Sequence, residues 1–205
     1  MNYRSMIILI GSAALVSSIT GCGGGGSDSS ATPAGSNPST TSYTIPPLST
    51  GTKQDYLNAI NNARTVQQDC GVEGIKPAVP ALVWNDKLYS AAAEHSSDMA
   101  KSDTFSHTGS GTQSDWTSEQ KGLGRGSTVT ERIENSGYDW QRNGENIAAG
   151  TNLDTVDAVI QGWLNSAGHC ANLMNPDFKD VGMAMAEDAN SKYIHYWTQD
   201  FGTLR

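Results

Sequence analysis

Several features of common functional classes are missing from this chain. No apolar run reaches the roughly 20 residues that a membrane-spanning helix needs. Neither the H-E-x-x-H pattern of a zinc-protease helix nor the G-x-S-x-G pattern of a hydrolase elbow occurs. Basic residues are also few, with 13 Lys and Arg against 21 Asp and Glu and a net charge of −8. That balance argues against nucleic acid as a partner and against electrostatic attachment to anionic lipid.

Cysteine is scarce as well, with three residues and no C-x-x-C spacing. Cys22 ends an apolar N-terminal segment, which leaves Cys70 and Cys170 as an isolated pair. In an oxidising compartment such a pair favours one disulfide, which would close a loop of about 100 residues. The alternatives are a thiolate metal site and a reactive Cys170 beside His169.

The N-terminal segment has the pattern of an export signal. Arg4 precedes a mostly apolar stretch, Met6 to Val16, and Ile19-Thr20-Gly21-Cys22 resembles a bacterial lipobox. Residues 1–21 are therefore predicted to be a lipoprotein signal peptide, with lipid attached to Cys22; an ordinary signal peptide is the alternative. The lipid would hold the protein to a membrane without crossing it. The expected location is extracytoplasmic, at the outer membrane or the cell surface.

Residues 22–51 form a second region, composed mostly of Gly, Ser, Thr, Pro, Ala and Asn. Such a segment cannot bury enough apolar surface to offset the entropy lost on ordering, so a flexible tether is predicted. Residues 52–205 remain, enough for one domain with a sizeable core.

Apolar residues at helical spacing predict two longer helices at the start of this domain. The first is expected over 53–68, with Tyr56, Ile60 and Val66 on its apolar stripe and Cys70-Gly71 as its stop.

The second long helix is expected from a cap at Asn85 or Asp86 to about Ser102. It carries His95 in an otherwise apolar seam. His95 is then either a core histidine or part of a cleft wall.

Later segments change from helical spacing to alternation. The sequence predicts a surface loop over 108–128, helices over 129–135 and 154–164, and strands near 181–185 and 193–201, the last two joined by a turn at Asn190-Ser191. Helices first and strands late indicate an α+β fold.

Four short motifs resemble those of one protein family in their order and spacing. They are Phe105-Ser106-His107, Gly144-Glu145-Asn146-Ile147-Ala148, Trp163-Leu164-Asn165-Ser166-Ala167-Gly168-His169 and Tyr196-Trp197-Thr198-Gln199. Together they resemble the CAP superfamily, the SCP domain of cysteine-rich secretory, antigen 5 and pathogenesis-related-1 proteins. The resemblance covers about 52–205 and implies a three-layer α-β-α sandwich. It also implies a cleft in which two His and two Glu residues can hold a divalent metal.

Only part of that cleft pattern is kept. His107 and Glu145 match the first His and the first Glu, whereas Ser166 and Tyr196 stand where the second Glu and the last His would be. His169 is the best remaining third ligand, so the resemblance implies a site for zinc or another divalent metal at His107, Glu145 and His169. The alternatives are a structural carboxylate at Glu145 and a helix-capping role for His107.

The incomplete cleft and the missing hydrolase patterns favour binding over catalysis. The expected function is a non-enzymatic binding module for a small apolar or lipid ligand or for a protein partner. The alternative is a metal-dependent hydrolase that acts on peptide or cell-envelope material.

Overall fold

The computed structural model describes residues 43–205, and the part from Ile45 to Arg205 forms one compact unit. The predicted signal peptide, Cys22 and most of the predicted tether lie outside the described residues. Among residues 43–205, no helix has both the length and the apolar character that crossing a membrane requires.

The folded unit begins earlier than residue 52. Leu48 packs against the core, and the Tyr89 hydroxyl donates to the carbonyl oxygen of Pro46 over 2.6 Å. Ser49 caps the first helix by accepting from the backbone N–H of Thr52. The end of the predicted tether, residues 45–51, therefore belongs to the domain.

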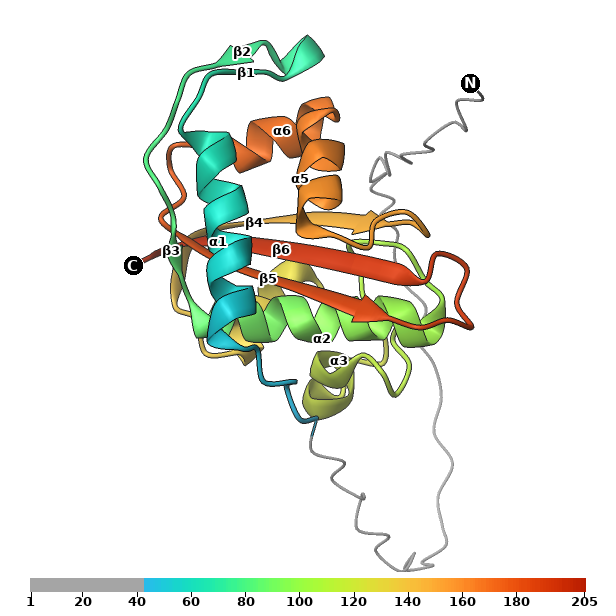
Figure 1. The fold of residues 1–205 in the computed structure, drawn as a ribbon. Helices are drawn as coiled ribbons and strands as arrows, with labels where there is room; N and C mark the ends of the chain where they lie inside the picture. Colours follow the sequence, from blue (N-terminus) through green and yellow to red (C-terminus); the bar gives the residue numbers. More distant parts are fainter. Residues whose placement is uncertain (1–42) are drawn as a thin grey trace, which may run out of the picture. The chain divides into compact units, whose positions relative to one another are not determined.

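A four-stranded sheet forms the centre of the domain, in the order β3-β5-β6-β4 (Figure 1). β6 (His195–Leu204) pairs antiparallel with both β5 (Asp180–Glu187) and β4 (Trp140–Ala149), and β3 (Val83–Trp84) runs parallel to β5. Because side chains alternate along a strand, each strand presents one set of residues to each layer of helices.

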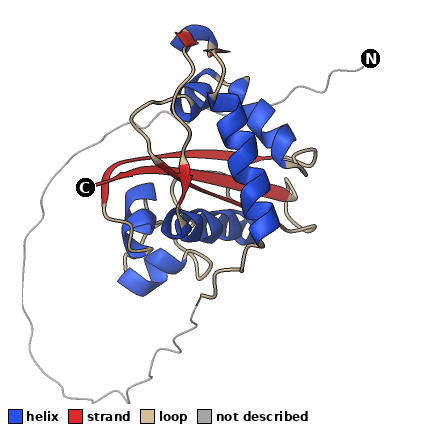
Figure 2. Ribbon diagram, turned by 60° about the vertical axis from the view of Figure 1, so that its left-hand side comes forward, coloured by secondary structure: helices blue, strands red, loops and turns tan. Residues whose placement is uncertain are grey.

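Helices cover both faces of this sheet (Figure 1 and Figure 2). On one side lie α2 (Asp86–Ser102), α3 (Trp116–Lys121) and α4 (Val129–Asn135). On the other lie α1 (Thr50–Arg64), α5 (Val156–Leu164) and α6 (Ala167–Leu173). The predicted α+β fold, a three-layer α-β-α sandwich, is confirmed.

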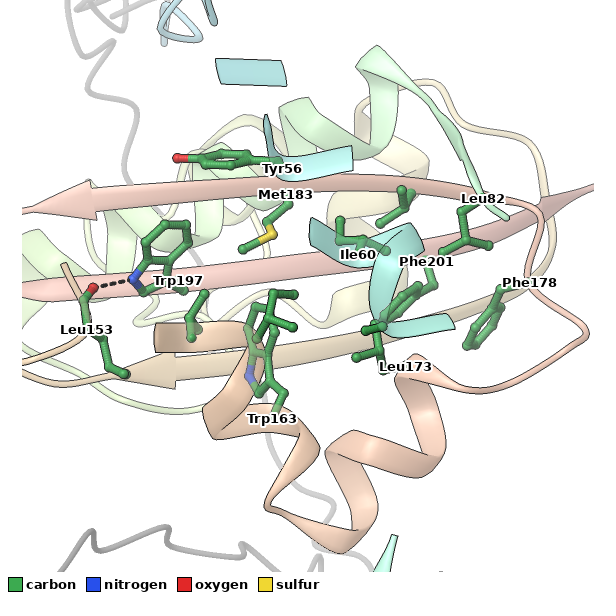
Figure 3. Packing of buried hydrophobic residues seen from close by; sticks show 14 residues of the cluster. Tyr56, Ile60, Leu82, Leu153, Trp163, Leu173, Phe178, Met183, Trp197 and Phe201 are labelled. Carbon is green, nitrogen blue, oxygen red and sulfur yellow. Dashed lines mark hydrogen bonds between the residues drawn. The ribbon is translucent and has the colours of Figure 1, made fainter. Parts of the chain in front are cut away.

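The larger apolar core lies between the sheet and the layer of α1, α5 and α6 (Figure 3). Its members include Ile60, Trp163, Met183, Trp197 and Phe201. The indole N–H of Trp197 donates to a backbone carbonyl oxygen over 2.7 Å, and that of Trp163 does so over 3.1 Å. With these polar ends satisfied, each large apolar side chain stabilises the fold by about 1.5–3 kcal/mol.

The first helix ends at Arg64, so the expected end at residue 68 was wrong. The chain turns back there, and the Gln68 side-chain amide donates to the carbonyl oxygen of Ala63 over 2.8 Å. Val66, expected on the buried stripe, is 54% exposed. Local capping by Gln68 thus stops the helix ahead of the expected stop at Cys70-Gly71.

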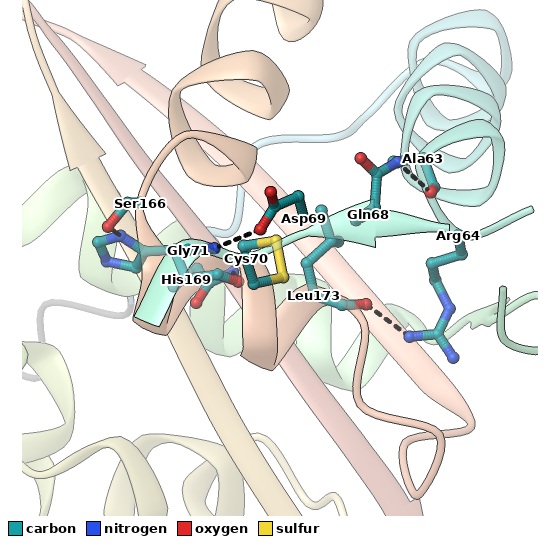
Figure 4. Close-up of a disulfide and its surroundings, with 11 residues drawn as sticks. Ala63, Arg64, Gln68, Asp69, Cys70, Gly71, Ser166, His169 and Leu173 are labelled. Carbon is teal, nitrogen blue, oxygen red and sulfur yellow. Dashed lines mark hydrogen bonds between the residues drawn. A yellow bond between two sulfur atoms is a disulfide. The ribbon is translucent and has the colours of Figure 1, made fainter. Parts of the chain in front are cut away.

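Cys70-Gly71 instead belongs to a small hairpin. Its strands are β1 (Gln68–Asp69) and β2 (Ile75–Lys76), with the 3-10 turn Gly71–Glu73 between them. The predicted Cys70–Cys170 disulfide is confirmed and ties this hairpin to α6 (Figure 4). Both thiols are therefore used, which excludes the thiolate metal site and the reactive Cys170.

The segment 108–128 lies largely at the surface, as expected, but it is not a loop throughout. It contains α3, and its backbone is hydrogen-bonded to carboxylates of α2. Glu94 accepts from the backbone N–H of Thr117, and Asp98 accepts from that of Ser110. A third carboxylate, Asp115, accepts from the backbone N–H of Ser127 over 2.8 Å. All three carboxylates belong to buried residues. The Gly, Ser and Thr residues supply hydrogen-bond donors to buried acids.

The remaining helix boundaries lie closer to the predicted ones. α2 begins behind its Asn85 cap and ends at Ser102, as predicted, and α4 matches 129–135. α5 begins after the Thr155 cap, slightly later than residue 154. β4 was not predicted as a strand.

Candidate functional site

Glu145 lies at the centre of the candidate site. It sits on β4, its side chain is 1% exposed, and it faces the layer of α2 and α4. The carboxylate has two partners: Oε1 accepts from His107 Nδ1 over 2.7 Å, and Oε2 accepts from Arg132 Nη2 over 2.8 Å. The structure thus brings His107 and Glu145, 38 residues apart in the chain, into direct contact.

Arg132 of α4 supplies the charge that balances Glu145. Its Nη2 also donates to the carbonyl oxygen of His107 over 3.0 Å, and its Nη1 donates to the carbonyl oxygen of Ser127 over 3.0 Å. Burial alone would lower the pKa of this guanidinium, but the charge of Glu145 and the hydrogen bond with it outweigh that effect and raise the pKa. The buried cation therefore fixes both the carboxylate and the backbone on each side of the 108–128 segment.

The same arrangement sets the charge of Glu145. Burial would raise the pKa of this carboxyl, but the Arg132 guanidinium and the His107 hydrogen bond outweigh burial and lower it. Glu145 is therefore an ionised carboxylate at neutral pH.

His95 of α2 supports the site from beneath. Its Nε2 donates to the carbonyl oxygen of Ser106 over 2.9 Å and lies 3.9 Å from Glu145 Oε1. Burial, followed by the charge of Arg132, lowers the pKa of His95 to about 3, so its ring is neutral. His95 is thus a core histidine that also holds the residue next to His107.

His107 is the exposed member of the group, with 52% of its side chain accessible. His169, the proposed third ligand, is half-buried on α6 and bonds through Nδ1 to the hydroxyl of Ser166 over 2.9 Å (Figure 4). Burial, followed by the charge of His107, lowers the pKa of His169 to about 4. Ser166, at the position of the family's second Glu, therefore orients an imidazole instead of supplying a carboxylate.

The other aligned position does not reach this group. Tyr196 is buried and its hydroxyl donates to Asp103 Oδ1 over 2.8 Å. His195, one residue earlier, bonds to the carbonyl oxygen of Gly150 at the start of β6.

These residues do not fit a three-ligand metal site. In the part of the chain that the structure describes, no group of three or more His, Cys, Asp or Glu side chains is arranged to hold a metal ion. Both oxygens of Glu145 are already hydrogen-bonded, Oε2 to Arg132 and Oε1 to His107, so a metal on Oε1 would have to displace His107 Nδ1, an atom of another predicted ligand.

Two members of the site, Arg132 and Asp200, were not predicted from the sequence. The signal for Arg132 was the Thr-x-x-Glu pattern at Thr128–Glu131, which forms a capping box and fixes where α4 starts. Asp200 follows the strand alternation: Trp197 and Phe201 face the larger core, so Asp200 faces the opposite layer with Glu145.

Comparisons with known proteins agree with this fold. A model of the cysteine-rich secretory protein family, CAP, matches residues 57–201, more than two thirds of the chain. Among solved structures, an extracellular protein containing an SCP domain from Bacillus anthracis str. Ames is 31% identical. That match covers 60% of this chain and 34% of the other, with a TM-score of 0.46.

Two curated relatives come from Bacillus subtilis (strain 168). The uncharacterized membrane protein YlbC is 31% identical over 127 residues, which are 62% of this chain and 30% of that protein. The uncharacterized protein YkwD is 27% identical over 162 residues, 79% of this chain and 51% of that protein. The chain thus spans between about a third and a half of the length of these two curated relatives.

Proposed function

Because the chain belongs to the cysteine-rich secretory protein (CAP) family, we propose that its folded domain is a binding module for a small apolar ligand, held outside the cytoplasm by lipid on Cys22. In this proposal Glu145 and its partners His95, His107 and Arg132, called here the Glu145 group, have a structural role. The ligand binds elsewhere, in a cavity.

A cavity of about 150 Å³ carries this proposal. It is bounded by α1, α2, β5 and the segment that leads into α1, and its lining includes Leu48, Tyr56, Tyr89, Ala93 and Met185. An apolar cavity of about this size takes a molecule such as benzene, whereas pockets for drug-sized ligands run to about 300–1,000 Å³. The ligand is therefore a single ring or the end of an acyl chain.

The geometry favours binding over hydrolysis. In the described part of the chain, the His107 ring has no hydroxyl or thiol as a hydrogen-bond partner that it could activate. Ser166 does contact an imidazole, but a His169 pKa of about 4 makes that ring a weak general base at neutral pH.

Two observations support an extracytoplasmic location. The Cys70–Cys170 disulfide is typical of oxidising compartments. The relative from Bacillus anthracis is described as extracellular, and YlbC is described as a membrane protein.

Cavity filling tests the proposal. Fluorobenzene is titrated and followed by fluorine NMR, with Ala93→Leu as the filling variant and Ala78→Leu, at an exposed position, as the matched control. We expect saturable binding in the wild type and in Ala78→Leu, and its loss in Ala93→Leu. Equal binding by a folded Ala93→Leu would refute the site. Turnover of ester or peptide substrates that His107→Ala abolishes would refute the non-enzymatic function.

A further inference from the structure

A second recess lies apart from the Glu145 group, where the chain leaves α4 and enters β4. Its volume is about 340 Å³, and its lining includes Glu134, Tyr138, Asp139, Trp140 and Arg205. The proposed apolar-ligand function uses none of these residues.

Trp140 is the fixed element of the recess. Its indole Nε1 donates to Glu134 Oε1 over 3.1 Å, and the ring packs against the buried cluster that contains Ile133 and Tyr138. An indole held in this way offers a rigid aromatic surface beside a carboxylate.

The guanidinium of Arg205 lies over the indole ring of Trp140. Its guanidinium carbon lies 5.7 Å from the centre of the Trp140 ring, and its Nε donates to the Trp140 carbonyl oxygen over 2.9 Å. The same Nε lies 3.6 Å from Asp139 Oδ1. The Arg205 and Asp139 side chains are 64% and 72% exposed, so water competes for these contacts and the guanidinium can be displaced.

We propose that this recess is a binding site for a guanidinium group, such as an arginine side chain of a peptide, and that Arg205 is its internal occupant. One indole surface and the carboxylates of Glu134 and Asp139 are the groups that recognise a planar cation. The two acids face the guanidinium of Arg205, while Lys87 Nζ donates to the carbonyl oxygen of Gly137 at the edge of the recess over 2.8 Å. A peptide arginine would stack on Trp140 and pair with Asp139 in its stead.

Because Arg205 competes for the same site, its removal should change the affinity for a guanidinium ligand in a particular direction. A ligand that must displace Arg205 binds with its intrinsic affinity reduced by the fraction of molecules whose site is open. Removing Arg205 should therefore strengthen binding, although it removes a side chain from the recess. An exposed cation–π contact corresponds to an effect of about threefold or more in affinity.

The test is an NMR titration with N-acetyl-arginine amide, read at the indole N–H of Trp140 and assigned with Trp140→Phe. N-acetyl-citrulline amide serves as the neutral ligand of the same shape, and choline as a cation without N–H donors. We expect saturable shifts with the arginine probe in the wild type, at least threefold tighter binding in Arg205→Ala, and loss of binding when Asp139→Asn is added to that variant. Lys53→Ala is the matched control, because Lys53 lies 5.5 Å over Trp84 in a similar exposed pair.

Three outcomes would overturn the proposal. They are equal or weaker binding by Arg205→Ala, citrulline or choline bound as tightly as arginine, or the same gain in Lys53→Ala. Because the probe is read at Trp140, none of these outcomes depends on the apolar cavity.

Discussion

Glu145 on β4 and Asp200 on β6 are directly opposite each other in the antiparallel register, and both side chains are buried. Arg132 hydrogen-bonds Glu145, whereas the carboxyl group of Asp200 interacts with the Glu145 carboxylate, a second acid. Burial, followed by the negative charge of Glu145, raises the pKa of Asp200 well above its usual range. The pair therefore carries one charge, on Glu145, and one proton, on Asp200.

Asp200→Asn should be at least as stable as the wild type at neutral pH. Asn has the shape of a protonated Asp but does not titrate. Above the unfolded pKa of about 3.9, the unfolded wild type loses a proton that the folded state keeps, so the stability contributed by this raised pKa falls as pH rises. The stability of the variant relative to the wild type should therefore rise between pH 5 and pH 7, measured by urea unfolding. A difference that does not change with pH would contradict a protonated Asp200.

Arg132→Met should destabilise the domain by about 3–5 kcal/mol, because it leaves the charge of Glu145 buried and unpaired. Arg142→Met is the matched control: Arg142 pairs with Asp177 at 3.4 Å, but its side chain is 62% exposed, so little change is expected. Adding Glu145→Gln to Arg132→Met should recover part of the loss. Equal losses of stability in Arg132→Met and Arg142→Met would show that burial of the Arg132–Glu145 ion pair is unimportant.

The sequence was sufficient to predict where a helix starts when one local signal determines that start. Asn85 caps α2, and Thr128 with Glu131 caps α4, and in each case the start of the helix follows from the neighbouring residues. The end of α1 was missed because Gln68 caps it from outside the apolar stripe. The contact of His107 with Glu145 came from the family resemblance, since no local pattern joins residues 38 apart.

The charged interior was harder to predict, because its members are brought together by tertiary contacts only. Arg132 is followed by the buried Ile133 on a short helix, so its own position gives no sign that it is buried with Glu145. Glu94 and Asp98 are acidic residues of α2, yet they are buried and bind Thr117 and Ser110. A Gly- and Ser-rich composition predicts a loop, but it does not show that buried acids fix that loop in place.

Loss of the disulfide should be costly. Cys70 and Cys170 are 100 residues apart, for which the chain-entropy model gives about 4.7 kcal/mol of stabilisation. The double variant Cys70→Ser/Cys170→Ser should unfold at a guanidinium concentration lower by a corresponding amount. Reductant should shift the wild type to the midpoint of the variant and leave the variant unchanged; a wild type insensitive to reductant would contradict a stabilising bond.

Removal of metal should not change stability. Glu145 is bound to Arg132 and His107, so a tightly held ion at His107, Glu145 and His169 is not expected. A metal present at 100 times its dissociation constant would add about 2.7 kcal/mol, or roughly 5–11 °C in Tm for a domain of this size. Scanning calorimetry with EDTA and then with zinc should give one Tm. A drop with EDTA that zinc restores in the wild type, but not in His107→Ala, would revive the metal site.

Lipid on Cys22 should be detectable as a mature chain that begins at that residue and carries more than one acyl chain. One myristoyl-length chain gives only marginal membrane binding, and the mature chain, without Arg4, would have 12 basic and 21 acidic residues, a net charge of −9, and gain no attraction from anionic lipid. Stable anchoring of this protein therefore needs at least two chains. Intact-mass analysis and detergent phase partition measure both properties, with Cys22→Ser as the unmodified variant and Cys70→Ser as a control that should still partition with detergent. A mature chain that starts elsewhere, or one found wholly in buffer, would rule out the anchor.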